Sequence, residues 1–366
     1  MERYREAKTP AQSRVFSLPL RSTLALKAQT LNVFELTRAL VDIESISDNE
    51  MQVGSYLYDY LSALAASSGG RVERMDVERG RFNVFASWGT PLVTLSTHMD
   101  TVPPFFPARE DSDHIWGRGS CDAKGIIASM IVAAEKLLVS GIRNLGLLFV
   151  VGEERSSAGA IAASRSPRGS RYLINGEPTE NKLVLASKGV LRLEAIATGR
   201  LAHSAYPELG ESAIEKLLDA LEKLRRVELP VDPLLGPSTM NIGTIAGGRA
   251  PNVIADSAKA EILVRVVGDP APVRQSLAQA VGDRVELKEV LFIPAIEFHS
   301  VDGIPTTVVS YTTDVPMFAG AWGEPLLLGP GSIHVAHTAE ERIAKSDLLQ
   351  AVDLYADAVR RLVAAC

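Results

Sequence analysis

Short motifs of histidine and acidic residues follow three apolar segments of this 366-residue sequence. They are His98-Met99-Asp100 after residues 92–97, Glu153-Glu154 after residues 145–152, and Gly176-Glu177 after residues 171–175. Ligands of open α/β sheets bind beyond the carboxyl ends of the strands. If the three apolar segments are neighbouring parallel strands, the motifs therefore meet at one edge of a sheet.

Two further candidate ligands lie in glycine-containing segments. Asp122 belongs to GRGSCDAKG, ahead of a predicted helix that begins near Gly125, and His337 belongs to GPGSIHVAHTAEE, ahead of the last predicted helix. Imidazoles and carboxylates without a thiolate suit zinc, cobalt or manganese in a catalytic site. Two such ions about 3.5–4 Å apart need a bridging carboxylate. We therefore predict a pair of divalent metal ions, with zinc favoured, and Asp122 as the bridge.

The elements that position these residues are predicted from apolar periodicity. In residues 31–43, apolar side chains recur at intervals of three and four, which favours a helix, and a second helix is expected at about 49–66. Strands at 81–88, 92–97, 145–152 and 171–175 alternate with a helix over 125–141. This alternation predicts an α/β fold whose mainly parallel sheet is flanked by helices.

The rhythm changes after Lys188 and returns at about residue 298. Between these points the pattern predicts the order βαββαβ, which is that of a ferredoxin-like unit. We therefore predict an N-terminal extension at 1–30, a catalytic domain formed by 31–188 and 298–366, and an inserted ferredoxin-like domain at 189–297.

Composition excludes several classes of protein. The net charge of −6 and the absence of a Lys/Arg-rich run argue against nucleic-acid binding. No apolar stretch reaches the roughly 20 residues of a membrane helix, and residues 1–22 lack the apolar core of a signal peptide. The two cysteines, Cys121 and Cys366, suggest no disulfide framework, so we expect a cytoplasmic protein without a membrane partner.

Seven motifs together resemble one known family. They are STHMDTVP, GRGSCDAKG, VGEE, GEPT, GRLAHSAYP, GGRAPNV and GPGSIHVAHTAEE, in this order. The chain resembles, over roughly residues 31–366, the dinuclear zinc metallopeptidases that include aminoacylase, acetylornithine deacetylase, succinyl-diaminopimelate desuccinylase and glutamate carboxypeptidases. The resemblance implies a zinc-peptidase-like catalytic domain.

The resemblance also implies roles for the residues of the predicted metal site. One metal takes His98, Asp122 and Glu177, and the other takes Asp122, Glu154 and His337. Glu153 stays unbound and acts as the general base toward a metal-bridging water that attacks the amide carbonyl. Asp100 holds the second ring nitrogen of His98.

Three residues of the inserted domain match family positions that contact substrate. His203 corresponds to a histidine that is donated across a dimer interface to the oxyanion, which implies a homodimer through the inserted domain. Asn252 and Arg265 correspond to residues that bind a substrate carboxylate. The family pattern also implies a cis peptide bond between Asp122 and Ala123.

The predicted function is removal of an acyl group from a small N-acyl-L-amino acid, with acetylornithine deacetylase-like activity in amino-acid biosynthesis as the specific hypothesis. Desuccinylase, dipeptidase and carboxypeptidase activities remain open, because branches of the family differ in a side-chain pocket that spacing does not show. A catalytically silent metal-binding or assembly protein is the alternative of another class. It predicts loss of a ligand or of the base, and all of these residues are present.

Overall fold

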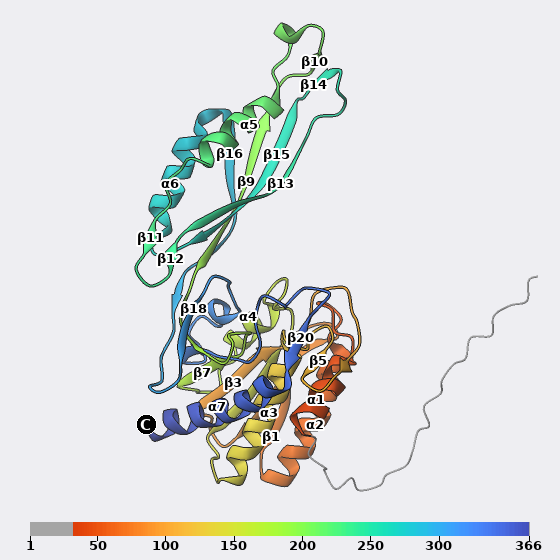
Figure 1. Cartoon of the computed structure of the whole chain (residues 1–366), viewed down its shortest axis with the longest axis vertical. Helices are drawn as coiled ribbons and strands as arrows, with labels where there is room; N and C mark the ends of the chain where they lie inside the picture. Colours follow the sequence, from red (N-terminus) through yellow and green to blue (C-terminus); the bar gives the residue numbers. More distant parts are fainter. Residues whose placement is uncertain (1–31, 366) are drawn as a thin grey trace, which may run out of the picture. The chain divides into compact units, whose positions relative to one another are not determined.

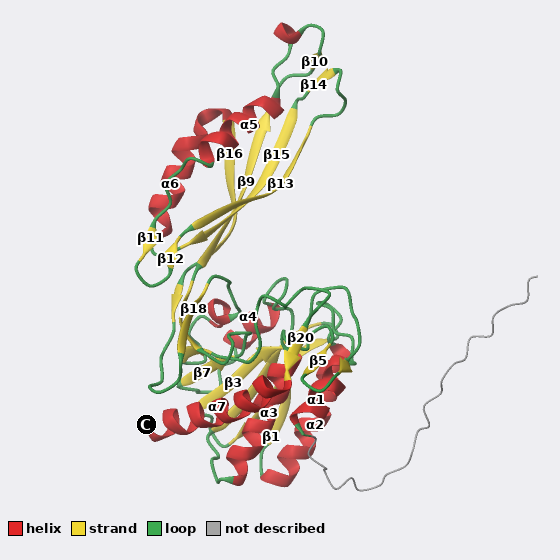
Figure 2. Cartoon of the chain, in the orientation of Figure 1, coloured by secondary structure: helices red, strands yellow, loops and turns green. Residues whose placement is uncertain are grey.

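The computed structural model describes residues 32–365, in which helices and strands alternate along most of the chain (Figures 1 and 2). The helices are α1 (Val33–Val41), α2 (Met51–Ser68), α3 (Lys124–Val139), α4 (Ala158–Ser164), α5 (Ala213–Leu224), α6 (Pro270–Val281) and α7 (Lys345–Ala364), with 3-10 turns η1 (Pro207–Leu209), η2 (Gly282–Arg284) and η3 (Val315–Phe318). The predicted N-terminal extension at 1–30 lies outside the described residues.

The strands form one large sheet, one medium sheet and several small ones. They are β1 (Arg71–Glu78), β2 (Arg81–Trp88), β3 (Val93–His98), β4 (Arg109–Glu110), β5 (His114–Trp116), β6 (Leu145–Val150), β7 (Tyr172–Asn175), β8 (Leu183–Ser187), β9 (Gly189–Thr198), β10 (Ala202–His203), β11 (Val231–Asp232), β12 (Gly236–Pro237), β13 (Thr239–Gly247), β14 (Val253–Ile254), β15 (Ser257–Val266), β16 (Val285–Ile293), β17 (Ile296–Glu297), β18 (Thr306–Val309), β19 (Glu324–Leu327) and β20 (Arg342–Ala344).

The large sheet has the strand order β1-β2-β6-β3-β7-β19. The pairs β6–β3, β3–β7 and β7–β19 are parallel, whereas β1 and β2 are antiparallel additions at one side. Every residue of β3, β6 and β7 is buried. Strands that are buried along their whole length are typical of parallel sheets covered on both faces. The predicted mainly parallel sheet is confirmed.

Helices cover both faces of this sheet. Successive side chains of β6 point to opposite faces: Leu147 and Phe149 join the core under α1, α2, α3 and α7, while Leu148 and Val150 pack in a second cluster with α4 and η3. Figure 1 shows α3 and α7 crossing in front of the sheet, and α3 is buried along most of its length.

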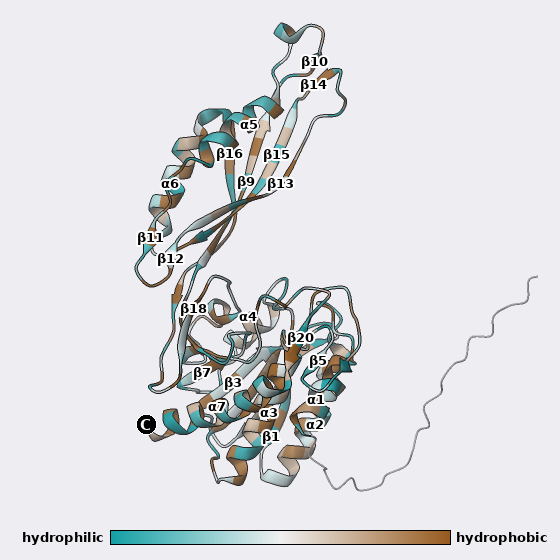
Figure 3. Ribbon diagram, in the orientation of Figure 1, coloured by the Kyte–Doolittle hydropathy of each residue, from teal (hydrophilic) through white to brown (hydrophobic). Residues whose placement is uncertain are grey.

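Residues 189–293 contain a separate four-stranded sheet. Its order is β16-β9-β15-β13, and each neighbouring pair is antiparallel. Numbered along the chain within this unit, the order is 4-1-3-2, as expected for the ferredoxin-like arrangement. One stripe of α5, with Leu217, Leu221 and Leu224, packs with the sheet and α6 into its own core. Figure 3 shows hydrophilic residues mixed with apolar ones on both helices. The predicted fold class is confirmed, whereas the domain boundaries at 188 and 298 stay a prediction.

The sequence pattern did not predict β1. Its residues, RVERMDVE, are mostly charged, and only Met75 is buried. A strand at the edge of a sheet faces solvent with most of its side chains, so it lacks the apolar alternation on which the prediction depends.

Among the described residues no helix is long and apolar enough to span a bilayer.

Candidate metal centre

The three predicted ligand motifs lie together at the carboxyl edge of the large sheet. β3 lies between β6 and β7, both parallel to it, and its last residue, His98, pairs with the last residue of β6, Val150. Glu153 and Glu154 follow directly in the turn after β6, and Glu177 follows β7. Parallel neighbours thus bring residues that are up to about 80 positions apart to one edge, as the strand-edge rule predicts.

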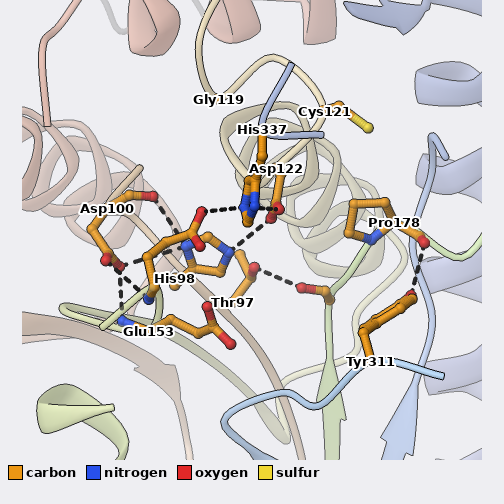
Figure 4. Close-up of polar contacts among 12 residues, drawn as sticks. Thr97, His98, Asp100, Gly119, Cys121, Asp122, Glu153, Pro178, Tyr311 and His337 are labelled. Atoms are coloured by element: carbon orange, nitrogen blue, oxygen red, sulfur yellow. Dashed lines mark hydrogen bonds and ion pairs between the residues drawn. The ribbon is translucent and has the colours of Figure 1, made fainter. Parts of the chain in front are cut away.

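Asp122 lies between the two histidines of the site (Figure 4). Its Oδ1 is 2.9 Å from His98 Nε2, and its Oδ2 is 3.3 Å from His337 Nε2. His337 Nε2 also lies 2.9 Å from Glu154 Oε1. The two carboxylate oxygens therefore face different imidazoles, which is the arrangement that a carboxylate bridging two cations requires.

Two groups of side chains at this edge have metal-ligand geometry. The first is His98, Asp122 and Glu177, and the second is Asp122, Glu154 and His337; within each group the ligand atoms lie within 4.8 Å of one another. These are the two sets that the sequence predicts. The assignment of the residues as ligands is a prediction that the geometry supports.

The donor set fits two divalent cations. Among the described residues, the buried Oε1 of Glu177 has no hydrogen-bond partner. Burial and the neighbouring carboxylates raise the pKa of Glu177 and of Glu153 well above the ordinary value for glutamate. Hydrogen bonds with Asp122 and Glu154 raise the pKa of His337 to about 10. Cations at this point would compensate a concentration of acidic groups that the protein alone balances only with imidazoles.

Asp100 organises both sides of the site. The Nδ1 atom of His98 lies 3.0 Å from the backbone oxygen of Asp100 and 3.5 Å from its Oδ1. The same carboxylate accepts hydrogen bonds from the backbone N–H groups of Glu153 and Glu154, at 3.0 and 3.2 Å, and from Ser47 Oγ at 2.7 Å. Burial opposes ionisation, but these bonds hold the pKa of Asp100 below its usual value. Asp100 therefore orients the turn that carries Glu153 as well as the ring of His98.

Arg265 contributes the guanidinium of the site. A cavity of about 250 Å³ is lined by the predicted ligands Asp122, Glu154, Glu177 and His337 together with Glu153, Arg265, Tyr311, Thr312 and Ile333. The Nη1 atom of Arg265 is buried and has no hydrogen-bond partner among the described residues. A buried N–H donor without a partner is costly, so a carboxylate ligand that accepts from Nη1 gains a charge-assisted bond.

The other two predicted substrate residues do not line this cavity. His203 is exposed in β10 and pairs with Val253 of β14, and Asn252 accepts a backbone hydrogen bond from Ser204 at 3.0 Å. Their roles stay predictions.

The peptide bond between Asp122 and Ala123 is cis, as the sequence resemblance implies.

Three residues at the site were not singled out from the sequence. Tyr311 lines the cavity and donates to the backbone oxygen of Pro178 at 2.8 Å (Figure 4). Asp314 is 1% exposed, and burial raises its pKa to about 7. Glu341 is fully buried behind Asp122. Glu341 falls within the quoted GPGSIHVAHTAEE motif, but Tyr311 and Asp314 lie in a turn-rich segment whose sequence gives no periodic signal.

The fold and the site together define a metallohydrolase that acts on peptide or amide bonds. Residues 94–361 match the model of the peptidase family M20/M25/M40. The chain is 40% identical over 337 residues to a peptidase M20 domain-containing protein of Schizosaccharomyces pombe, a match that covers 88% of this chain and 83% of that protein. The chain belongs to the peptidase family M20/M25/M40.

Two further proteins illustrate the similarity. A probable carboxypeptidase of Aspergillus oryzae is 39% identical over 370 residues, which cover 87% of this chain and 84% of the relative. The crystal structure of a dinuclear metal-binding peptidase of the M20 family from Bacillus subtilis has the same fold. Its TM-score is 0.64 at 16% identity, with 91% of this chain and 97% of that chain covered.

Proposed function

We propose that the protein hydrolyses the amide bond that precedes a terminal amino acid with a free α-carboxylate. The observation that carries this proposal is the buried Nη1 atom of Arg265, which has no hydrogen-bond partner among the described residues, in the same cavity as Glu153 and Asp122. A carboxylate bound to Arg265 places the amide bond of a small substrate toward the acidic cluster. Both N-acyl amino acids and short peptides present this carboxylate.

The chain's own residues supply binding and proton transfer. Two divalent ions, with zinc favoured and cobalt or manganese as alternatives, would be held by the two ligand sets and would polarise the carbonyl and a water molecule. Glu153 belongs to neither set, lines the cavity and has a raised pKa. It can therefore take a proton from the attacking water and deliver it to the leaving amine. Asp100 fixes the backbone of this base.

Two narrower activities fit this proposal. Acetylornithine deacetylase-like activity follows from the sequence motifs, whereas carboxypeptidase activity is favoured by the relative that is named a probable carboxypeptidase. The two activities share the free carboxylate and differ in the acyl side of the bond. The presence of both ligand sets and of the base argues against a catalytically silent protein.

His203 belongs to the proposal through the predicted homodimer. Because its side chain is exposed and does not line the cavity of its own subunit, it can serve a second subunit as an oxyanion donor. The homodimer and the cytoplasmic location stay predictions.

Paired substrates test the role of the carboxylate. Acetylated, succinylated and benzoylated amino acids and dipeptides are assayed with zinc, cobalt and manganese. Each free acid is compared with the same compound whose C-terminal carboxylate is converted to an amide. We expect cleavage of the free acids alone, and Arg265→Met should raise KM for them by one to two orders of magnitude, roughly the loss of one charge-assisted pair. Equal cleavage of the acids and the amides would contradict the proposal, and the ranking of acyl groups distinguishes deacetylase from carboxypeptidase.

A further inference from the structure

The carboxylate of Glu341 lies behind the segment that carries Asp122. Glu341 follows the turn of His337 and precedes β20, and its side chain is fully buried. Its Oε1 accepts hydrogen bonds from three backbone N–H groups, those of Gly119 at 2.9 Å, Cys121 at 3.2 Å and Asp122 at 3.2 Å. One oxygen atom therefore accepts from three backbone N–H groups of the turn that leads into α3.

The second oxygen of Glu341 binds a buried arginine. Arg118 Nη1 donates to Oε2 at 2.5 Å, and the arginine side chain is 2% exposed. Arg118 Nε also donates to the backbone oxygen of Pro104 at 3.2 Å. The negative charge is thus compensated inside the protein, as a buried carboxylate requires.

The residue at the start of the next helix does not cap this turn. Helix α3 begins at Lys124, and its N-cap residue, Ala123, makes no side-chain capping bond. The buried backbone N–H groups of the residues before this cap need an acceptor. Glu341 supplies the acceptor from 219 positions further along the chain. The backbone N–H of Asp122 itself is therefore bound by Glu341.

We infer that Glu341 is the positioning residue of the two-metal site. It holds the backbone of Asp122 so that the two carboxylate oxygens face His98 and His337. Because Glu341 lies on the same short segment as His337, it also fixes the spacing between Asp122 and His337. This inference rests on the proposed metal site and assigns to Glu341 control over its affinity and geometry, without contact to metal or substrate.

Cobalt binding tests this role independently of turnover. The parent and Glu341→Gln are titrated with Co²⁺ by calorimetry and by visible absorption. We expect cobalt affinity to fall about ten- to a hundredfold, the usual effect of losing a partner that orients a ligand, together with a changed absorption band. A folded Glu341→Gln with the parent's affinity and spectrum would overturn the inference.

A matched control separates positioning from loss of stability. Glu50 is also a buried carboxylate bound by a buried arginine, Arg81, at 2.7 and 2.9 Å. Glu50→Gln should lower the melting temperature comparably while leaving cobalt affinity unchanged. Equal losses of cobalt affinity in Glu50→Gln and Glu341→Gln would show a general effect of destabilisation and would contradict the inference.

A second variant applies if Glu341→Gln does not fold. In Arg118→Met/Glu341→Met the ion pair is replaced by apolar side chains, which buried pairs often tolerate, while the acceptor for the three N–H groups is lost. The same fall in cobalt affinity is expected, and the parent's affinity in this variant would overturn the inference. If the parent itself binds no pair of cobalt ions, the proposed metal site fails first, and the two failures are thus distinguishable.

Discussion

Two adjacent glutamates, Glu153 and Glu154, have different surroundings in the site. Glu154 points to His337 and belongs to a ligand set, whereas Glu153 belongs to neither set and lines the cavity. The turn that holds them is fixed by two backbone hydrogen bonds to Asp100. The predicted base and a predicted ligand are therefore consecutive residues of the same turn.

Exchange of the base should abolish turnover but retain the metal ions. In Glu153→Gln we expect kcat to fall by about 10²–10⁴, the contribution of a positioned general base, because the amide cannot accept the proton. Metal content, measured by mass spectrometry after gel filtration, should equal that of the parent. In Glu154→Gln, by contrast, metal content should fall. A Glu153→Gln variant that keeps its turnover would remove the proposed base.

The candidate ligands that the structure brings together could be selected from the sequence, because each one follows a recognisable strand or lies in a recognisable motif. The strand-edge rule needs only the position of a residue after an apolar segment, and His98, Glu154 and Glu177 satisfy it. Glu341 and Asp314 are placed at the site by tertiary structure, for example by the contact of Glu341 with Gly119, which is far away along the chain. No local pattern encodes such a contact, so sequence reasoning did not assign these residues a role.

At the scale of elements, the strands buried on both faces could be predicted and the edge strand could not. The segments that form β2, β3, β6 and β7 were placed within one or two residues, because burial on both faces favours segments rich in apolar and β-branched residues. β1 and the short strands β18 and β19 pair through backbone atoms with few buried side chains, and these residues carry little period-two signal.

Helix α3 contains a glutamate that should make stability depend on pH. Burial raises the pKa of Glu135 to about 7, although Tyr60 donates a hydrogen bond to it at 3.3 Å. In the unfolded chain the pKa is that of an ordinary glutamate, so the folded state binds more protons between about pH 4.5 and 7. The contribution of this residue to the free energy of unfolding therefore decreases as pH rises through this window.

The variant Glu135→Gln should accordingly raise the melting temperature at pH 8 and leave it almost unchanged at pH 4.5. Differential scanning calorimetry across this range measures the difference between variant and parent. Glu286→Gln, at an exposed position of β16, is the control and should shift neither value. A Glu135→Gln variant whose stability difference is the same at both pH values would contradict the assigned cause.

The whole molecule follows the predicted combination of a mainly parallel sheet and a ferredoxin-like unit. The order β16-β9-β15-β13 agrees with the succession βαββαβ. This succession consists of two βαβ segments, and few arrangements of two such segments in one sheet satisfy the rules for connections. The assembly of subunits could not be derived from apolar periodicity. It rests on the resemblance of the segment around His203 to a family motif.

Mixing two inactive variants tests whether His203 acts in a second subunit. His203→Ala and Glu153→Gln are each expected to have little activity. Random exchange of subunits makes about half of the dimers mixed, and each mixed dimer has one complete site, so about a quarter of the parent's activity should return. Absence of recovery, with mixed dimers demonstrated by differently tagged subunits, would contradict action in a second subunit.

We propose that Asp122 bridges two cations between His98 and His337. Crystals grown with zinc and measured by anomalous diffraction at the zinc edge provide the decisive test. We predict two peaks about 3.5–4 Å apart, one beside each histidine, with one oxygen of Asp122 at each peak. A single peak, or a pair of peaks that Asp122 does not join, would contradict it.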